Sequence, residues 1–156
     1  MDAPFVANVR DLPWLHNDAK GDCCIFEDPE HEFGQIGYTL AVLQPGQGGH
    51  YHRELDNQED FLVLSGECIA LLEGEEHRLR AWDFVHCPPG AAHAFVGAGD
   101  GPCVILMAGA RYSRRYVYLA DTRARELGVG VEVETTDPKE AYAGLPTWEP
   151  GEPVDL

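Results

Sequence analysis

Short apolar segments recur about every ten residues through the middle of this chain, separated by turn-forming residues. No stretch shows sustained helical periodicity, and each apolar segment is shorter than a typical helix. Glycine and proline, 17 and 11 of the 156 residues, are frequent in the turns between them. The pattern predicts one all-β domain built as a sandwich or barrel. The six segments are residues 36–43, 61–64, 68–72, 84–87, 94–96 and 103–107.

Three histidines and one acidic residue fall where they could surround a single metal ion. His50 and His52 are two residues apart, so an extended backbone directs both side chains to one face. Glu59 opens an apolar segment, and His93 follows a Pro-Pro-Gly turn at residues 88–90. Imidazole and carboxylate groups bind divalent transition metals, so the set predicts a site for iron, manganese, nickel or zinc.

Each of these predicted ligands has an alternative reading. Any one of the histidines could instead be a hydrogen-bonded structural side chain. Asp56 could replace Glu59 as the acidic ligand, but it lies in a segment that looks like a turn, whereas Glu59 begins a strand. Cys87 is the cysteine closest in sequence to a predicted ligand, which leaves a thiolate ligand as a further alternative.

The same residues resemble the two sequence motifs of the cupin superfamily. The first motif is His-x-His followed by an acid and a glycine, and the second is Pro-x-Gly followed by a histidine. The matching residues are His50, His52, Glu59, Gly66, Pro88, Gly90 and His93. The six residues between His52 and Glu59 exceed the usual spacing, which implies a longer loop. The resemblance covers about residues 34–110 and implies a double-stranded β-helix, a jelly-roll barrel with the metal inside.

We expect the barrel to occupy residues 34–118, between an N-terminal arm at 1–33 and a C-terminal extension at 119–156 that packs on it. The arm holds an uncertain strand or two, and the extension begins with short helical turns. The last dozen residues form a tail that is extended or disordered unless Trp148 docks it. The elements expected in the extension are a helical turn at 122–127, a strand at 129–134 and a helix at 137–142.

Two of the apolar segments, residues 61–64 and 104–107, are apolar on both faces, whereas a sheet with one face in water would alternate. The second face must therefore pack against something besides the barrel interior. The N-terminal segment or the C-terminal tail could cover it. We favour a homodimer, which is also typical of what the resemblance implies.

Acidic residues outnumber basic ones, 27 against 11, and the net charge of −16 repels nucleic acid and anionic membranes. The partner expected is a small-molecule substrate or ligand. The basic cluster of Arg111, Arg114 and Arg115 is more readily explained as neutralising nearby acids than as an anion site. The five cysteines are odd in number and mostly lie in apolar segments, so we expect reduced thiols and, without a leader or membrane segment, a cytoplasmic protein.

The ligand set predicts a metal-dependent enzyme acting on a small organic substrate, with dioxygenase chemistry favoured. Phe61 and Phe95 follow Glu59 and His93 by two residues, so they share the ligands' face and could contact an apolar substrate. They could equally just fill a small barrel. The alternatives are a metal-binding or small-molecule-binding protein without turnover, and a Lewis-acid isomerase, decarboxylase or cyclase.

A phosphosugar isomerase is less attractive from the sequence, because the only lysines are Lys20 and Lys139 and neither lies in the predicted barrel. A Lewis-acid mechanism also needs a group that carries a proton. Glu54 and His86 are the candidates, but Glu54 could equally orient a ligand histidine, and His86 more plausibly bonds locally. We assign no catalytic residue.

Overall fold

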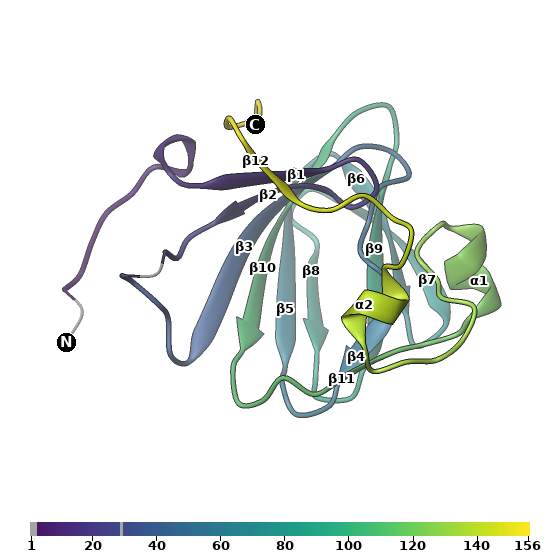
Figure 1. The fold of residues 1–156 in the computed structure, drawn as a ribbon. Coiled ribbons are helices and arrows are strands. Elements are labelled where there is room, and N and C mark those ends of the chain that lie inside the picture. The colour runs from purple at the N-terminus through teal and green to yellow at the C-terminus, as the bar shows by residue number, and fades with distance from the viewer. Residues whose placement is uncertain (1–2, 29) are drawn as a thin grey trace.

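The computed structural model describes residues 3–28 and 30–156. Two antiparallel sheets pack face to face as a barrel, and the helices are short and lie at its edge (Figure 1). The predicted all-β architecture is confirmed. None of the helices in the described residues is long and apolar enough to cross a membrane.

The larger sheet has seven strands in the order β12-β1-β2-β3-β10-β5-β8. Each apolar segment predicted in this part of the chain forms a strand here. The strands are β1 (Trp14–Asn17), β2 (Gly21–Ile25), β3 (Ile36–Leu43), β5 (Glu59–Ser65), β8 (Phe84–Cys87), β10 (Cys103–Ala110) and β12 (Glu149–Gly151).

The smaller sheet has five strands in the order β11-β4-β9-β6-β7. The strands are β4 (His52–Glu54), β6 (Glu67–Leu72), β7 (Glu75–Arg80), β9 (Ala92–Ala98) and β11 (Tyr116–Tyr118). Three short helices accompany the sheets: the 3-10 helix η1 (Val9–Asp11), α1 (Thr122–Glu126) and α2 (Pro138–Ala141).

The C-terminal extension follows the sequence-based expectation only in part. Helix α1 ends before Gly128, which has a positive φ of 81°, and α2 starts after Asp137, whose side chain caps it. The strand predicted at 129–134 is wrong. Val129 and Val131 pack against two different clusters, and Val133 is exposed. No strand among the described residues pairs with this segment, and the ladder contact nearby is a single bridge between Tyr118 and Thr135.

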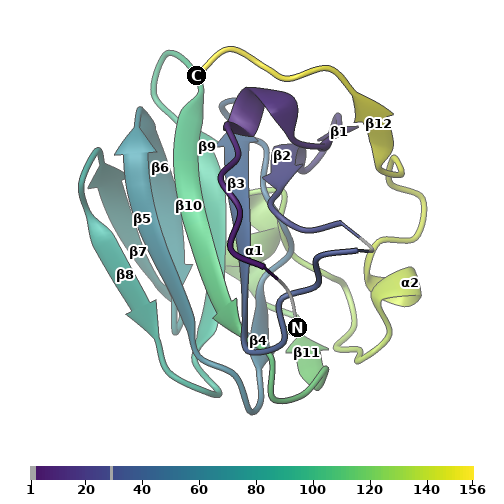
Figure 2. The ribbon, with the colours of Figure 1, turned by 90° about the vertical axis from the view of Figure 1, so that its left-hand side faces the viewer.

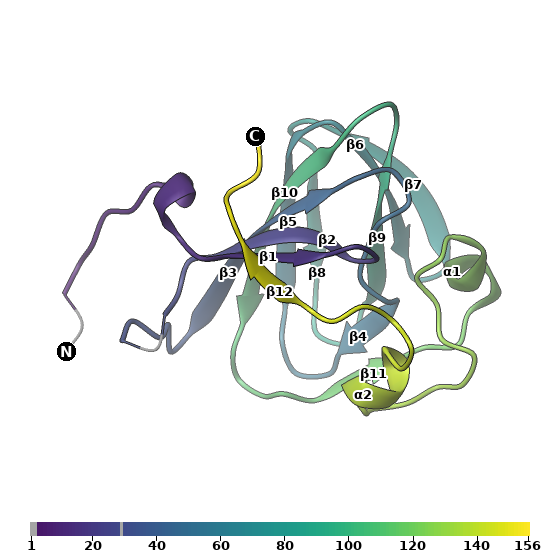
Figure 3. The same ribbon diagram turned by 45° about the horizontal axis from the view of Figure 1, so that its top comes forward.

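Both ends of the chain join the seven-stranded sheet. The predicted N-terminal arm, whose residues 1, 2 and 29 lie outside the described residues, contains the hairpin β1–β2, and β2 pairs with β3. The C-terminal tail crosses back to pair β12 with β1, so residues more than 130 positions apart lie side by side (Figure 3). The sheet is therefore wider than the predicted barrel segment alone would make it.

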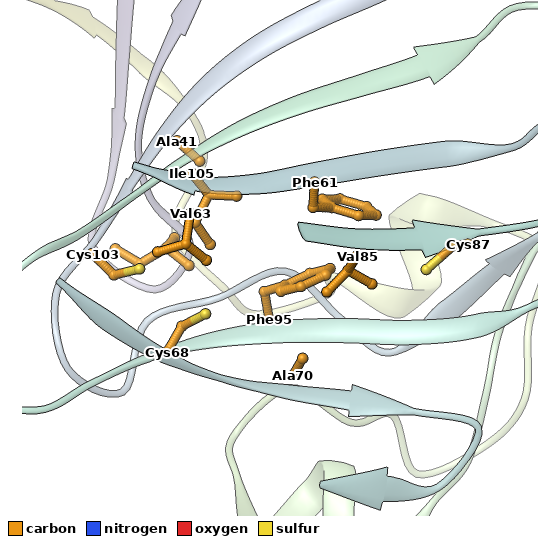
Figure 4. Close-up of a cluster of buried hydrophobic side chains, with 11 residues drawn as sticks. Ala41, Phe61, Val63, Cys68, Ala70, Val85, Cys87, Phe95, Cys103 and Ile105 are labelled. Atoms are coloured by element: carbon orange, nitrogen blue, oxygen red, sulfur yellow. The ribbon is translucent and has the colours of Figure 1, made fainter. Parts of the chain in front are cut away.

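The space between the sheets is filled by a compact apolar cluster. Ile105 and Val63 of the larger sheet meet Cys68 and Ala70 of the smaller one, and all four side chains are almost fully buried. Phe61 and Phe95 lie further along this cluster, with their tilted rings in contact between the sheets (Figure 4). The barrel is thus packed at one end and lined by aromatic rings toward the other.

A second apolar cluster covers the outer face of the seven-stranded sheet. It includes Trp14, whose indole nitrogen donates to the Val9 carbonyl oxygen at 2.8 Å, together with Leu40 and Val104. The N-terminal segment and η1 cross this side of the sheet (Figure 2), and Val154 of the tail packs here too. Segments from both termini therefore account for part of the apolar outer face, and the homodimer stays a prediction.

All five cysteines, which fall within the described residues, are free and buried. This agrees with the expectation of reduced thiols. Cys68 and Cys103 lie together in the barrel interior (Figure 4), where they pack as small apolar side chains.

We expect Ile105→Ala to destabilise the protein by about 2–5 kcal/mol, because a fully buried side chain in the middle of β10 would leave a cavity between the sheets. Urea unfolding followed by circular dichroism measures this. Val133→Ala is the control, since Val133 is 75% exposed. Equal stability of the two variants would contradict the position of the core.

Candidate metal centre

Two of the predicted ligands are brought together by strand pairing. His52 of β4 and His93 of β9 are directly opposite each other in the antiparallel register, and their ring centroids are 4.7 Å apart. Side chains of such a pair emerge on the same face of the sheet. Here that face is the interior of the barrel, so the two imidazoles lie next to each other inside it.

Backbone carbonyl groups fix the orientation of both rings. Nδ1 of His52 is 2.8 Å from the carbonyl oxygen of His50, and Nδ1 of His93 is 3.0 Å from that of Ala91. Because a carbonyl oxygen only accepts hydrogen bonds, each Nδ1 carries the proton. In the neutral ring Nε2 then presents a lone pair, which is how histidine ligands of metals are commonly held.

Glu59 reaches the same point from the opposite sheet. It opens β5, as predicted, and its Oε2 atom lies 2.9 Å from Nε2 of His93 and 3.9 Å from Nε2 of His52. Oε2 is buried and accepts no well-directed hydrogen bond among the described residues. One ligand atom from each of the three residues lies within 4.8 Å of the others, so this donor set fits a divalent transition metal.

The electrostatics of the cluster also fit a cation. Burial by itself would lower the pKa of His93, but the side chains of Cys87 and Glu59 raise it to about 10. Burial would raise the pKa of Glu59, but the nearby His93 and His52 lower it. Burial and the charge of His93 lower the pKa of His52. The cluster thus holds one positive charge beside the carboxylate, and a metal ion would take the place of that proton.

His50 is not part of the three-residue cluster in this structure. Strand β4 begins only at His52, and the His50 ring stacks on Tyr142 with centroids 4.3 Å apart and an interplanar angle of 7°. Its Nδ1 atom is buried without a hydrogen-bond partner among the described residues, and the ring lines the same pocket as the cluster. Its role as a fourth ligand therefore stays a prediction.

The alternative acidic ligand lies elsewhere. Asp56 accepts a hydrogen bond from the Ser113 hydroxyl at 2.6 Å and lies 3.5 Å from the guanidinium of Arg115. Both contacts hold its carboxylate on a loop outside the cluster. The structure thus brings Glu59, rather than Asp56, to the two histidines.

The two candidate proton carriers differ in position. Glu54 is half-buried, and burial together with the charge of Glu59 raises its pKa. Its Oε2 atom accepts a hydrogen bond from Asn57 at 3.3 Å. His86 is half-exposed and its Nδ1 atom lies 2.6 Å from Asp60, so it bonds locally, as expected, on the outside of the barrel.

A pocket of about 390 Å³ opens beside the cluster, a size suited to a small molecule. Phe61 and Phe95 line it and also belong to the barrel core, with their ring centroids 4.3 Å apart. The Phe61 ring lies 5.2 Å from that of His93. The two phenylalanines therefore fill the barrel and border the pocket at the same time, and their contact with a substrate stays a prediction.

Residues from both ends of the chain line the pocket and were not predicted to do so. Lys20 precedes β2, Tyr142 caps α2 and Trp148 precedes β12. Lys20 corrects one argument made from the sequence. It lies outside residues 34–118, as stated, but the β1–β2 hairpin belongs to the sheet and brings its side chain to the pocket. No local sequence signal predicts this, because it depends on the pairing of β1 with β2 and β12.

Comparison with known proteins gives both a family and relatives. The family model for the cupin domain matches residues 39–109. The chain is 28% identical over 115 residues to the glucose-6-phosphate isomerase of Thermococcus litoralis, in an alignment that covers 63% of this chain and 60% of that protein. The chain thus spans less than two thirds of the length of this curated relative.

Solved structures extend the likeness to most of the chain. A sugar phosphate isomerase of the cupin superfamily from Silicibacter pomeroyi has a TM-score of 0.56 at 19% identity, covering 86% of this chain and 80% of that one. A predicted oxalate decarboxylase from Thermotoga maritima has a TM-score of 0.60 at 17% identity, covering 68% and 98%. At these identities the likeness shows the fold alone, which is the double-stranded β-helix.

We expect Glu59→Gln to lose bound metal, because it removes the negative charge and one ligand atom. The loss of affinity should exceed the roughly 10–100-fold typical when only a hydrogen bond to a ligand is lost. Elemental analysis after loading with Zn²⁺ or Mn²⁺ measures it. Asp56→Asn is the matched control and should bind metal like the unchanged protein. Loss of metal from Asp56→Asn but not from Glu59→Gln would exclude Glu59 as the acidic ligand.

The raised pKa of His93 predicts how the stability of the metal-free protein depends on pH. The protonated His93 contributes to the free energy of unfolding. This contribution is fully present below pH 6.5, the ordinary pKa of histidine, and is lost as the pH rises toward about 10. After chelation, thermal unfolding should therefore show a larger loss over this range for the unchanged protein than for His93→Gln. Identical pH profiles for the two proteins would refute the paired state of His93.

Proposed function

This chain belongs to the cupin superfamily, and we propose that it is a metal-dependent enzyme acting on a small organic molecule. One observation carries the proposal. The His52 and His93 Nε2 atoms and a buried oxygen of Glu59 converge at the side of a pocket large enough for a substrate. A site with only a structural metal needs no such opening.

We further propose that the reaction is a proton transfer of the isomerase type. When bound, a divalent ion supplies a Lewis acid that stabilises negative charge on a substrate oxygen. The curated relative named glucose-6-phosphate isomerase supports this class. So does Lys20, because it gives the pocket the cation whose absence argued against a phosphosugar substrate.

The chain's own residues contribute in distinct ways. The carbonyl groups of His50 and Ala91 hold the His52 and His93 rings so that their Nε2 atoms face the pocket. Glu59 supplies the negative charge that keeps a cation beside them. The rings of Phe61 and Phe95 keep water away from one side of the pocket, which strengthens these charge interactions.

Dioxygenase chemistry is the second candidate. The three-residue cluster contains two histidines and one carboxylate, which is the donor set of many non-haem iron oxygenases. The phenylalanines on the pocket wall also suit an apolar substrate. The two candidates predict different metals and different co-substrates, so one experiment separates them.

The protein would be loaded in turn with Mn²⁺, Zn²⁺, Ni²⁺ and Fe²⁺ and incubated in deuterium oxide with glucose 6-phosphate and other small hydroxy-carbonyl anions. We expect incorporation of deuterium at the carbon beside the carbonyl group, seen by proton NMR, with a rate that falls at least about 100-fold in Glu59→Gln. Asp56→Asn should retain the rate.

An oxygen electrode would monitor the same mixtures and a set of aromatic substrates. Oxygen uptake by the iron-loaded protein without deuterium incorporation would replace the isomerase with a dioxygenase. Stoichiometric metal binding with neither activity would contradict the enzyme and leave a metal-containing binding protein.

We also propose that the partner is a small molecule rather than nucleic acid or a membrane, which the net charge of −16 supports. The homodimer is proposed on the exposed apolar side chains that remain on the outside of the barrel. These include Ile36, Tyr38 and Phe84, which lie on β3 and β8.

A further inference from the structure

Lys20 is held at the pocket by the turn between β1 and β2. The side-chain oxygen of the buried Asn17 accepts hydrogen bonds from the backbone N–H groups of Ala19 and Lys20, at 2.9 and 3.0 Å. The Asn17 amide nitrogen in turn donates to the carbonyl oxygen of Pro146 at 2.8 Å. The backbone of Lys20 is thus anchored on both the hairpin and the C-terminal segment.

The ammonium group of Lys20 lies against aromatic rings. Its Nζ atom is 3.2 Å from the centroid of the Tyr142 ring and 5.5 Å from that of Trp148. His50 stacks in parallel on Tyr142, and two groups cannot occupy one face of a ring at these distances. Lys20 and His50 therefore lie on opposite faces of Tyr142, and the ring stiffens the position of both.

No anionic group neutralises this ammonium among the described residues. The chain carries 27 acidic side chains, yet none of those in residues 3–28 and 30–156 places an oxygen within 4.0 Å of the Lys20 Nζ atom. Burial lowers the pKa of Lys20, so the charged form is held at some cost. A lysine ammonium can donate three hydrogen bonds, and aromatic faces accept them only weakly.

We propose that Lys20 binds the anionic group of the substrate, a phosphate or a carboxylate, while the other end of the same molecule meets the His52, Glu59 and His93 cluster. Both lie on the wall of one pocket of about 390 Å³, so a small molecule can contact them together. The inference rests on the proposed function, since it assigns the substrate class of that pocket. An anion there would provide the missing partner for a partly buried cation.

The competing explanation is that Lys20 only fastens the C-terminal segment through its contacts with Tyr142 and Trp148. In that case an added anion would not recognise it in preference to any other lysine. The sequence provides a suitable internal comparison, because Lys139 is the one other lysine and it is exposed on α2.

Protein labelled with ¹³C and ¹⁵N in lysine gives one set of side-chain signals for each of the two lysines, which Lys139→Arg assigns. The zinc-loaded and the chelated protein would each be titrated with inorganic phosphate, with acetate and with chloride at matched ionic strength. We expect the Lys20 signals to shift and saturate with phosphate or acetate in both forms, while those of Lys139 do not. Tighter binding of phosphate would indicate a phosphorylated substrate, and tighter binding of acetate a carboxylated one.

Equal shifts of both lysines, or the same Lys20 shift with chloride, would overturn the proposal. A second measurement uses variants. Lys20→Met should lose at least about tenfold in phosphate or acetate affinity, the effect of removing one charged hydrogen bond, and should keep full zinc stoichiometry. Lys139→Met should change neither. Unchanged anion binding in Lys20→Met would also refute the site, whereas loss of zinc from the unchanged protein would count against the metal centre alone.

Discussion

The partly buried carboxylate of Glu59, whose Oε2 atom is shielded from solvent, is the constraint around which this structure is organised. A carboxylate between two sheets is unfavourable unless positive charge or hydrogen bonds compensate it. Here the compensation comes from the opposite sheet, through the cross-strand pair of His52 and His93. The Nε2 atoms of both rings are directed toward Glu59 because two backbone carbonyl groups accept hydrogen bonds from the Nδ1 atoms. The surroundings of the Glu59 Oε2 atom are therefore fixed by three local features: the pairing of β4 with β9, the turn before β9 and the start of β5.

The parts of this arrangement that depend on local sequence could be predicted. The apolar segments mark strands such as β3 and β8, and Glu59, His52 and His93 are recognisable because strand alternation and the Pro-Pro-Gly turn fix their faces. Strand β7 was missed because it is an exposed, charged strand at the edge of its sheet. The valines at 129–134 alternate as a strand does, but no partner strand is available. Alternation of apolar residues reflects the burial of side chains, whereas a strand also requires backbone hydrogen bonds to a neighbouring strand.

The positions of His50 and Lys20 could not be predicted from local sequence patterns. Strand alternation predicts that the side chains of His50 and His52 share one face. Strand β4 begins only at His52, however, and the His50 ring stacks on Tyr142. Lys20, Tyr142 and Trp148 come from segments that surround the barrel motif, and they reach the pocket through contacts between chain ends. A motif therefore identifies the side of the pocket that carries the candidate metal ligands, whereas the residues that the chain ends bring to the pocket depend on tertiary structure.

The pairing of β12 with β1 can open locally, at a lower free energy than the unfolding of the barrel core. The strands share three residue pairs at the outermost edge of the sheet, and one of the paired residues, Pro150, has no N–H group to donate. Opening this junction breaks few hydrogen bonds and leaves the barrel core intact, so its amide hydrogens should exchange far faster than those of β10. The wall that carries Trp148 would thus loosen and reform many times during the lifetime of one folded barrel. Because Trp148 directly precedes β12 and lines the pocket, such an opening would change one wall of the pocket without unfolding the two sheets.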